Sequence, residues 1–176
     1  MVGVWGRSGR VSVHILSEES SVLMQCVLLG KPTPPTRFAA ANILIGRLML
    51  HDEKRFDYRL EALWTLRDAL EYPILGNSDK QQLARLYRAV PAATKLIETI
   101  GQRIYQWCYE SQGKPQEDPG PRGPLWKGDC GFCVGRWELW QKRFLELGDE
   151  SSLSEEDRQG AKKAANTMSG ISQGII

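Results

Sequence analysis

Two cysteines have a spacing that can support thiol chemistry, in the sequence Cys130-Gly-Phe-Cys133. Paired thiols two residues apart at a helix N-terminus can have lowered pKa values and can cycle through a disulfide. In thioredoxin-type proteins, however, such a pair directly follows a buried strand. Here the preceding segment is rich in proline and glycine and shows no strand pattern. Dithiol redox catalysis is therefore the least favoured of three functional hypotheses.

A structural zinc site would need two ligands in addition to this cysteine pair. Cys26, Cys108, His14 and His51 are the cysteines and histidines that remain, and none of them are paired at ligand spacing. The sequence therefore predicts no metal site and no cofactor.

Charged and amide side chains interrupt two otherwise apolar helical patterns. The segment Phe38–Leu50 is apolar nearly all round except for Asn42 and Arg47. An unpaired cation in an apolar interior costs many kcal/mol, so we expect Arg47 to find an internal partner. Arg67 follows the apolar spacing of the next helix, with Glu71 four residues later. We expect these two to form a partly buried ion pair, and Asn42 to be a satisfied core amide.

The alternative for these residues is an internal ligand pocket. Six tryptophans are a high count for 176 residues, and they could line such a pocket. Helical bundles can hold apolar ligands, which a few polar side chains then orient. The candidate ligand-binding residues are Asn42, Arg47, Trp64, Arg67, Glu71, Trp126 and Trp137. We expect a closed cavity of a few hundred Å³ if this hypothesis holds.

These side chains must be positioned by helices, because apolar residues recur at helical spacing along most of the chain. Caps, prolines and glycines bound the predicted helices at about 17–30, 36–51, 57–72, 80–107, 134–148 and 154–171. Pro91 falls inside the fourth pattern and predicts either a kinked helix or two helices that meet there. The fold prediction is an all-α, single-domain helical bundle of about six helices, with Phe38–Leu50 at its centre.

The predicted helical domain covers residues 17–172, after an irregular N-terminal arm at 1–16. A long Pro/Gly-rich loop at 112–131 precedes the fifth major helix, and long connections in compact domains are often functional. Leu125 and Trp126 indicate that the second half of this loop is held against the core, because a large aromatic gains burial energy only when it is covered.

Composition excludes several classes of protein. The 176 residues carry 23 Lys+Arg and 21 Asp+Glu, interspersed without a basic block, which disfavours nucleic-acid binding. No apolar run is long enough to cross a membrane. Residues 1–16 lack the apolar core of a secretory signal, and four cysteines are too few for a disulfide scaffold. We expect a soluble cytoplasmic protein.

Several separated blocks resemble an uncharacterised helical protein family of filamentous fungi, domain of unknown function 3632. The blocks are Phe38–Asn42, Gly46–Leu48, Tyr58, Leu63–Glu71, Gly123–Trp126, Arg136–Phe144 and Leu153–Ala165. The resemblance implies a soluble, all-helical fungal protein, and it supplies no catalytic residue, cofactor or partner. Members are sometimes encoded near specialised-metabolism genes. Residues 1–16 depart from the family, and Cys130 and Cys133 are not part of its pattern.

The sequence shows no convergent acid, base, nucleophile or metal set. The leading hypothesis is therefore a non-enzymatic helical protein that binds a protein partner or an apolar small molecule. The alternative is a small enzyme of specialised metabolism that uses the internal pocket, and the lesser alternative is the dithiol redox protein.

Overall fold

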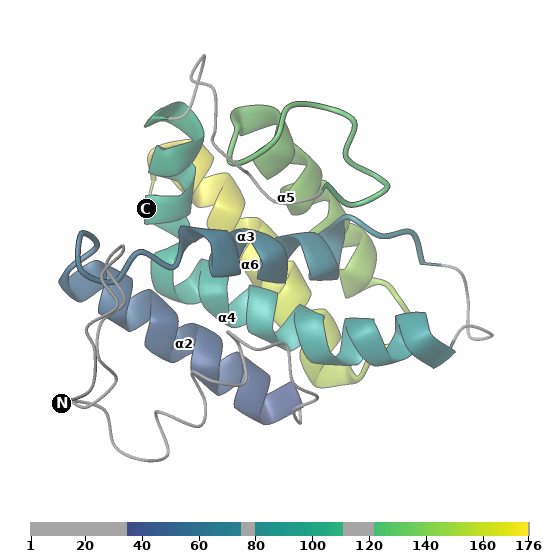
Figure 1. The fold of residues 1–176 in the computed structure, drawn as a ribbon. Helices are drawn as coiled ribbons and strands as arrows, with labels where there is room; N and C mark the ends of the chain where they lie inside the picture. The colour runs from purple at the N-terminus through teal and green to yellow at the C-terminus, as the bar shows by residue number, and fades with distance from the viewer. Residues whose placement is uncertain (1–34, 75–79, 111–121, 176) are drawn as a thin grey trace, which may run out of the picture.

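The computed structural model describes residues 35–74, 80–110 and 122–175. Within these ranges the chain is entirely helical, with no strand. The helices are α2 (Pro35–His51), α3 (Arg59–Leu70), α4 (Lys80–Glu110), α5 (Val134–Gly148) and α6 (Glu155–Ser172) (Figure 1). The all-α class is confirmed with five described helices against about six expected. The predicted arm at 1–16, the helix at 17–30 and the loop residues 112–121 lie outside the described residues.

Helix α4 is the centre of the fold, because it contacts each of the other four described helices. Its middle is buried on nearly every side, with Ala92, Ala93, Leu96 and Ile97 at most 1% exposed. The prediction that the Phe38–Leu50 helix is central was wrong. Helix α2 packs on one side of α4 and leaves its opposite face in solvent. Its apolar composition reflects small alanines, which do not require burial on all sides.

Helix α4 runs through Pro91 without ending there, and its backbone departs from helical dihedrals at Ile100 instead (φ −132°, ψ 20°). Gly101 follows immediately, and glycine is a poor helix former. A Cβ at Gly101 would lie 3.0 Å from Cδ1 of Ile171, so its missing side chain also permits close packing on α6. Beyond this point the last turns of α4 change direction (Figure 1).

Helix α2 runs parallel to α4. The Arg88 guanidinium lies 5.0 Å from the Phe38 ring, near the start of both helices. Further along, a Cβ on Gly46 would lie 3.0 Å from Cγ2 of Thr99. The two contacts follow the same order in both helices, so the helices point the same way.

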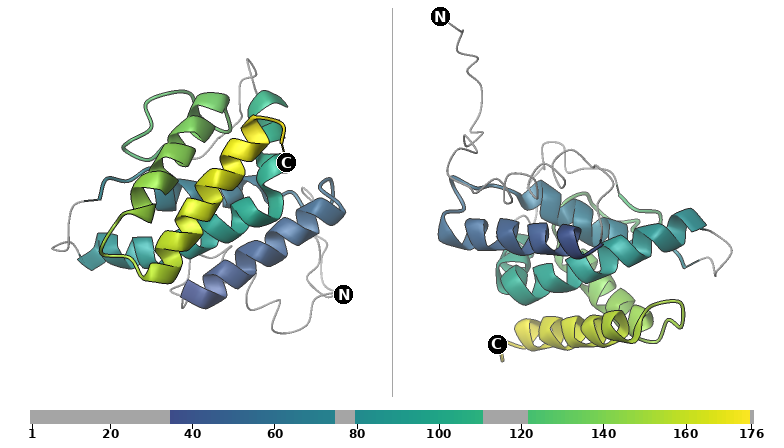
Figure 2. Two further views of the ribbon diagram at one scale, coloured as in Figure 1. Left: turned by 180° about the vertical axis from the view of Figure 1, so that it is seen from behind. Right: turned by 90° about the horizontal axis from the view of Figure 1, so that it is seen from below.

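Helix α6 is also parallel to α4, on another side of it. Ser154 caps α6 by accepting a hydrogen bond from the Asp157 backbone N–H, as its sequence predicts. Gly160 lies against Thr94 of α4, and Ile171 lies against Gly101. The right view of Figure 2 accordingly shows α4 between α2 and α6. Helix α5 is antiparallel to α6, since Trp137 near its start donates to Oγ of Ser172 at the end of α6 (2.9 Å).

Candidate functional site

A fully buried carboxylate, Glu71, lies where α3 ends and receives four hydrogen bonds. Arg136 of α5 donates from Nε to Oε1 (2.5 Å) and from Nη2 to Oε2 (2.9 Å). Trp140 Nε1 donates to Oε1 (2.8 Å), and the Gly123 backbone N–H donates to Oε2 (2.9 Å). We call these four residues the Glu71 cluster. Their hydrogen bonds compensate a charge pair that would otherwise be costly to bury.

The Glu71 cluster joins the end of α3 to the loop before α5 and to α5 itself, with Gly123 and Arg136 lying 52 and 65 residues from Glu71 in sequence. The Glu71 carbonyl accepts from the Leu125 backbone N–H (3.0 Å), and Arg136 Nη1 donates to the Gly131 carbonyl (2.9 Å). A Cβ on Gly123 would lie 2.4 Å from Cβ of Glu71, so only glycine permits this approach of the loop. The prediction that the second half of the loop is held against the core is confirmed for Leu125.

The predicted ion pair between Arg67 and Glu71 was wrong. Arg67 instead donates to the neighbouring Asp68, with Nη2 2.7 Å from Oδ1. Glu71 is the C-cap residue of α3, where the chain leaves the helix, and its side chain is directed to α5. Sequence spacing alone gave no signal for Arg136, which lies 65 residues away. Because the cluster is closed to solvent, it can stabilise the fold but has no access for a substrate.

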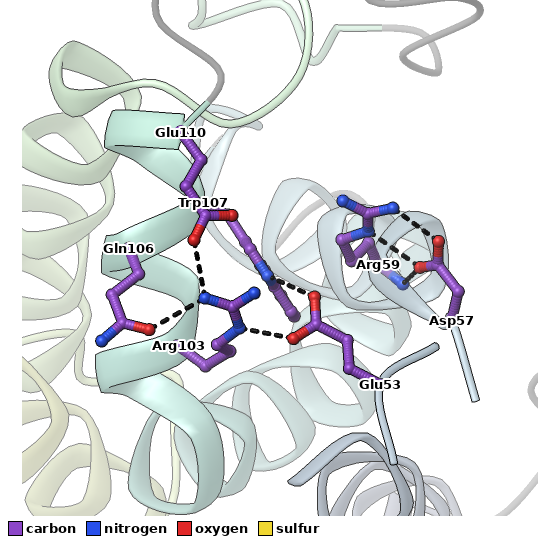
Figure 3. A network of polar contacts seen from close by, with 7 residues as sticks. All are labelled: Glu53, Asp57, Arg59, Arg103, Gln106, Trp107 and Glu110. Atoms are coloured by element: carbon purple, nitrogen blue, oxygen red, sulfur yellow. Dashed lines mark hydrogen bonds and ion pairs between the residues drawn. The ribbon is translucent and has the colours of Figure 1, made fainter. Parts of the chain in front are cut away.

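A second polar cluster connects the segment between α2 and α3 to the end of α4 (Figure 3). Glu53 accepts from Arg103 Nε (2.5 Å) and from Trp107 Nε1 (2.9 Å). Arg103 Nη1 also donates to Glu110 (2.8 Å) and Gln106 (2.9 Å). The hydrogen bond from Arg103 is the main reason that the pKa of Glu53 lies below its usual value.

The Glu53 side chain faces a polar cleft of about 490 Å³. Its lining residues are Asp52, Glu53, Lys54, Asp57, Arg59 and Arg103. Arg59 pairs with Asp57 through two hydrogen bonds, from Nε (2.9 Å) and Nη2 (2.6 Å). The lining carries three acidic and three basic side chains, and both guanidinium groups already contact carboxylates. The cleft therefore has no excess charge with which to attract an ion of either sign.

A hollow larger than this cleft is an apolar groove of about 750 Å³ between α2 and α6, with α4 as its floor. We call it the α2–α6 groove. Its residues are Pro35, Thr36, Ala39, Ala40 and Ile43 of α2; Tyr87, Pro91, Thr94, Lys95 and Glu98 of α4; and Ser154, Glu156, Asp157, Gln159, Gly160 and Lys163 at the start of α6. The short side chains of Ala39, Ala40 and Gly160 keep this space open.

Charged side chains lie at the two ends of the α2–α6 groove. Because the three helices are parallel, Glu156 and Asp157 lie at the end where α2 begins. Lys95 and Lys163 lie at the other end, and both contact Glu98, at 2.8 Å and 3.0 Å. The groove thus has an acidic end, an apolar middle and an end with two lysines.

The comparisons with known proteins identify one family. Residues 27–144 match the family described as "Protein of unknown function (DUF3632)". The chain belongs to this family. The matched residues of the DUF3632 domain include α2, α3, α4 and the Glu71 cluster, whereas α6 lies beyond them. No curated protein and no solved structure matches the chain.

Three of the residues predicted to bind a ligand in this DUF3632 protein differ in their burial and in their partners. Asn42 is fully buried, donates to the Phe38 carbonyl (2.9 Å) and accepts from Thr65 Oγ1 (3.0 Å). It is the satisfied core amide that the sequence predicts. Arg47 is exposed, so the prediction of an internal partner was wrong. Trp64 is half-buried, and its Nε1 has no hydrogen-bond partner among the described residues.

The two predicted tryptophans outside α3 have separate structural roles. Trp126 is half-buried, donates from Nε1 to the Asp129 carbonyl (2.6 Å), and covers Gly128 and Gly135. Trp137 is 1% exposed and packs against Tyr105, with ring centroids 5.0 Å apart. Neither lines the α2–α6 groove. Sequence reasoning missed the groove because its residues are mostly alanine, proline and surface charges.

Two of the described cysteines of the DUF3632 chain, Cys108 and Cys133, have raised pKa values. Cys133 is the N-cap residue of α5, and burial raises its pKa above the usual value. Burial also raises the pKa of Cys108 to about 12. A raised pKa reduces the thiolate fraction, which is the opposite of what dithiol catalysis requires.

Among residues 35–74, 80–110 and 122–175, no three His, Cys, Asp or Glu side chains gather closely enough to hold a metal ion. None of the helices in those ranges has the length and apolar character needed to span a membrane.

Proposed function

We propose that this protein is a non-enzymatic binding protein that holds an apolar small molecule in the α2–α6 groove. The observation that carries the proposal is a hollow of about 750 Å³ with a mainly apolar lining, formed by three helices. Small-molecule sites usually have volumes of roughly 300–1,000 Å³ and combine apolar walls with a few polar groups. The groove meets both conditions.

The lining suggests how such a ligand would lie. Ala39, Ala40, Ile43 and Pro91 offer apolar surface to its body. The hydroxyl of Tyr87 already donates to the Ser152 carbonyl (2.9 Å), which fixes the ring at the groove wall. Burying apolar ligand area here would contribute about 25 cal/mol for each Å² removed from water.

The expected biological setting forms part of the same proposal. The resemblance to a fungal family suggests a ligand from specialised metabolism, and the cysteine usage suggests the cytoplasm. Both are consistent with a carrier or sensor of an apolar metabolite.

The proposal can be tested with the neutral fluorophore N-phenyl-1-naphthylamine, whose emission increases in an apolar site. We expect saturable binding to the full chain, and at least tenfold weaker binding to Ala40→Trp, because the indole would fill the groove. Ala84→Trp places the same side chain at an exposed position of α4 outside the groove and should bind like the wild type. The measurement is the Kd from fluorescence titration. Equal Kd values for the two variants would contradict a site in the groove.

A further inference from the structure

We propose that the α2–α6 groove selects apolar molecules that carry a neutral hydrogen-bond donor, either a hydroxyl or an N–H group, and that the backbone carbonyl of Tyr87 accepts this hydrogen. The inference rests on the proposed function, since it specifies the class of ligand for the same groove. Its basis is the proline inside α4, together with the hydrogen bonds that the neighbouring hydroxyl groups already form.

Pro91 leaves one carbonyl group of α4 without its usual donor. In a regular α-helix, each backbone N–H donates to the carbonyl four residues earlier. Proline has no N–H, and its ring also crowds the carbonyl at that position. Helix α4 continues through Pro91, from Lys80 to Glu110. The Tyr87 carbonyl therefore lacks the backbone hydrogen bond that residue 91 would otherwise donate.

The Tyr87 carbonyl lies at the floor of the groove. Tyr87 and Pro91 are both lining residues, and residues four apart occupy the same face of a helix. Carbonyl groups in a helix point along its axis towards the C-terminus. The Tyr87 carbonyl is therefore directed towards the level of Pro91, between the two lining residues. Because Pro91 is only half-buried, a molecule in the groove can approach this position.

The hydroxyl groups on this part of the floor cannot replace the missing N–H. The Tyr87 hydroxyl donates to the Ser152 carbonyl (2.9 Å), and Thr94 Oγ1 donates to the Val90 carbonyl (2.9 Å). A hydroxyl has a single hydrogen, so each of these oxygens is left as an acceptor. This part of the floor thus offers acceptors, and a ligand has to supply the hydrogen.

The apolar surroundings turn the unpaired carbonyl into a source of specificity. Ala39, Ala40 and Ile43 of α2 line the same groove. A ligand that covers the Tyr87 carbonyl without donating to it removes water from an acceptor and leaves that acceptor unpaired, which is unfavourable. A ligand with an O–H or N–H group replaces the lost water. The groove should therefore prefer a donor to an ether of similar shape.

The experiment compares three naphthalenes of similar size. 1-Naphthol carries an O–H group, 1-naphthylamine carries an N–H group, and 1-methoxynaphthalene carries no donor. Their Kd values for the full chain are measured by displacement of N-phenyl-1-naphthylamine. We expect at least one of the two donors to bind roughly fivefold or more tightly than the ether. Apolar burial alone would favour the ether, because it has an additional methyl group. The tighter of the two donors shows whether O–H or N–H is preferred.

The matched variant is Pro91→Ala, which restores a backbone N–H that can donate to the Tyr87 carbonyl. Alanine is a much better helix former than proline, so α4 should be retained. The preference for donors over the ether should disappear. The ratio of Kd values is the appropriate measure, because the loss of the proline ring affects all three compounds. Gln102→Ala, at an exposed position of α4 outside the groove, should keep the wild-type ratio.

The two proposals fail in different ways. If all three compounds bind the wild type with the same Kd, the inference is wrong and the proposed function stands. A preference that persists in Pro91→Ala would also overturn the inference, because another oxygen, such as that of Thr94, would then be the acceptor. If neither the fluorophore nor any of the three compounds binds, the proposed function is wrong as well.

Discussion

At the scale of single residues, the most consequential side chain is Glu71. It is fully buried, and each of its oxygens accepts two hydrogen bonds. Arg136 is equally buried, and its third hydrogen bond goes to the Gly131 carbonyl. Removing one member of such a pair strongly destabilises the fold, because the other then remains as an uncompensated buried charge.

We expect Glu71→Ala to lower the free energy of unfolding by about 3–5 kcal/mol, because it strands the Arg136 guanidinium in the core. The measurement is urea denaturation followed by tryptophan fluorescence. Glu138→Ala, at an exposed position of α5, is the matched control and should change stability little. Replacing both partners, as Glu71→Leu with Arg136→Met, should recover much of the loss. A single variant as stable as the control would show that the pair contributes nothing.

At the scale of elements, the segment between α2 and α3 is held to α4 through Glu53. Its carboxylate accepts from Arg103 and Trp107, both near the end of α4. The last turns of α4, beyond the irregular residue Ile100, carry both donors. The change in direction at Ile100 thus places these donors where the α2–α3 connection can meet them.

The lowered pKa of Glu53 predicts a dependence of stability on pH. A carboxyl group with a lower pKa in the folded state stabilises the fold above its unfolded pKa, about 4.3, and loses this effect as the pH falls through the folded value. The stability difference between the wild type and Glu53→Gln should therefore be largest near pH 7 and should shrink in acid. Urea denaturation at several pH values measures it. A difference that stays constant with pH would contradict this account, and Glu138→Gln serves as the control.

At the scale of the whole molecule, α4 organises the domain. Each of the other described helices packs on α4. Helix α2 packs mainly on α4 and leaves its opposite side exposed to solvent. The groove exists because α2 and α6 both lie along α4 without closing over it. The burial of α4 and the open α2–α6 groove thus both result from the way in which the other helices pack along α4.

This arrangement predicts a gradient in hydrogen exchange. Amides in the buried middle of α4, around Leu96 and Ile97, should exchange most slowly, at rates close to those of global unfolding. Amides of α2 should exchange faster, because fewer neighbours must separate before that helix opens. Native-state hydrogen exchange measured by mass spectrometry gives the comparison. Slower exchange in α2 than in α4 would show that α4 is not the most stable element.

Sequence patterns were informative wherever the determining interactions are local. Ser154 caps α6 as predicted, α5 has the predicted bounds, and Asn42 is a satisfied amide. The patterns failed where a residue's partner lies elsewhere in the chain. Arg47 on an apolar helix was expected to be buried, because periodicity cannot tell which side of a helix stays exposed when its small residues fit either environment.

The sequence by itself determined the all-helical class and most helix boundaries, because apolar spacing and caps act over a few residues. The tertiary structure alone decided that Glu71 pairs with Arg136, that α4 and not α2 is central, and that α2 and α6 flank a groove. These features depend on how helices pack across long separations in sequence. Many packings satisfy the same local pattern, and the combined fit of buried charges, glycines and apolar faces selects one of them.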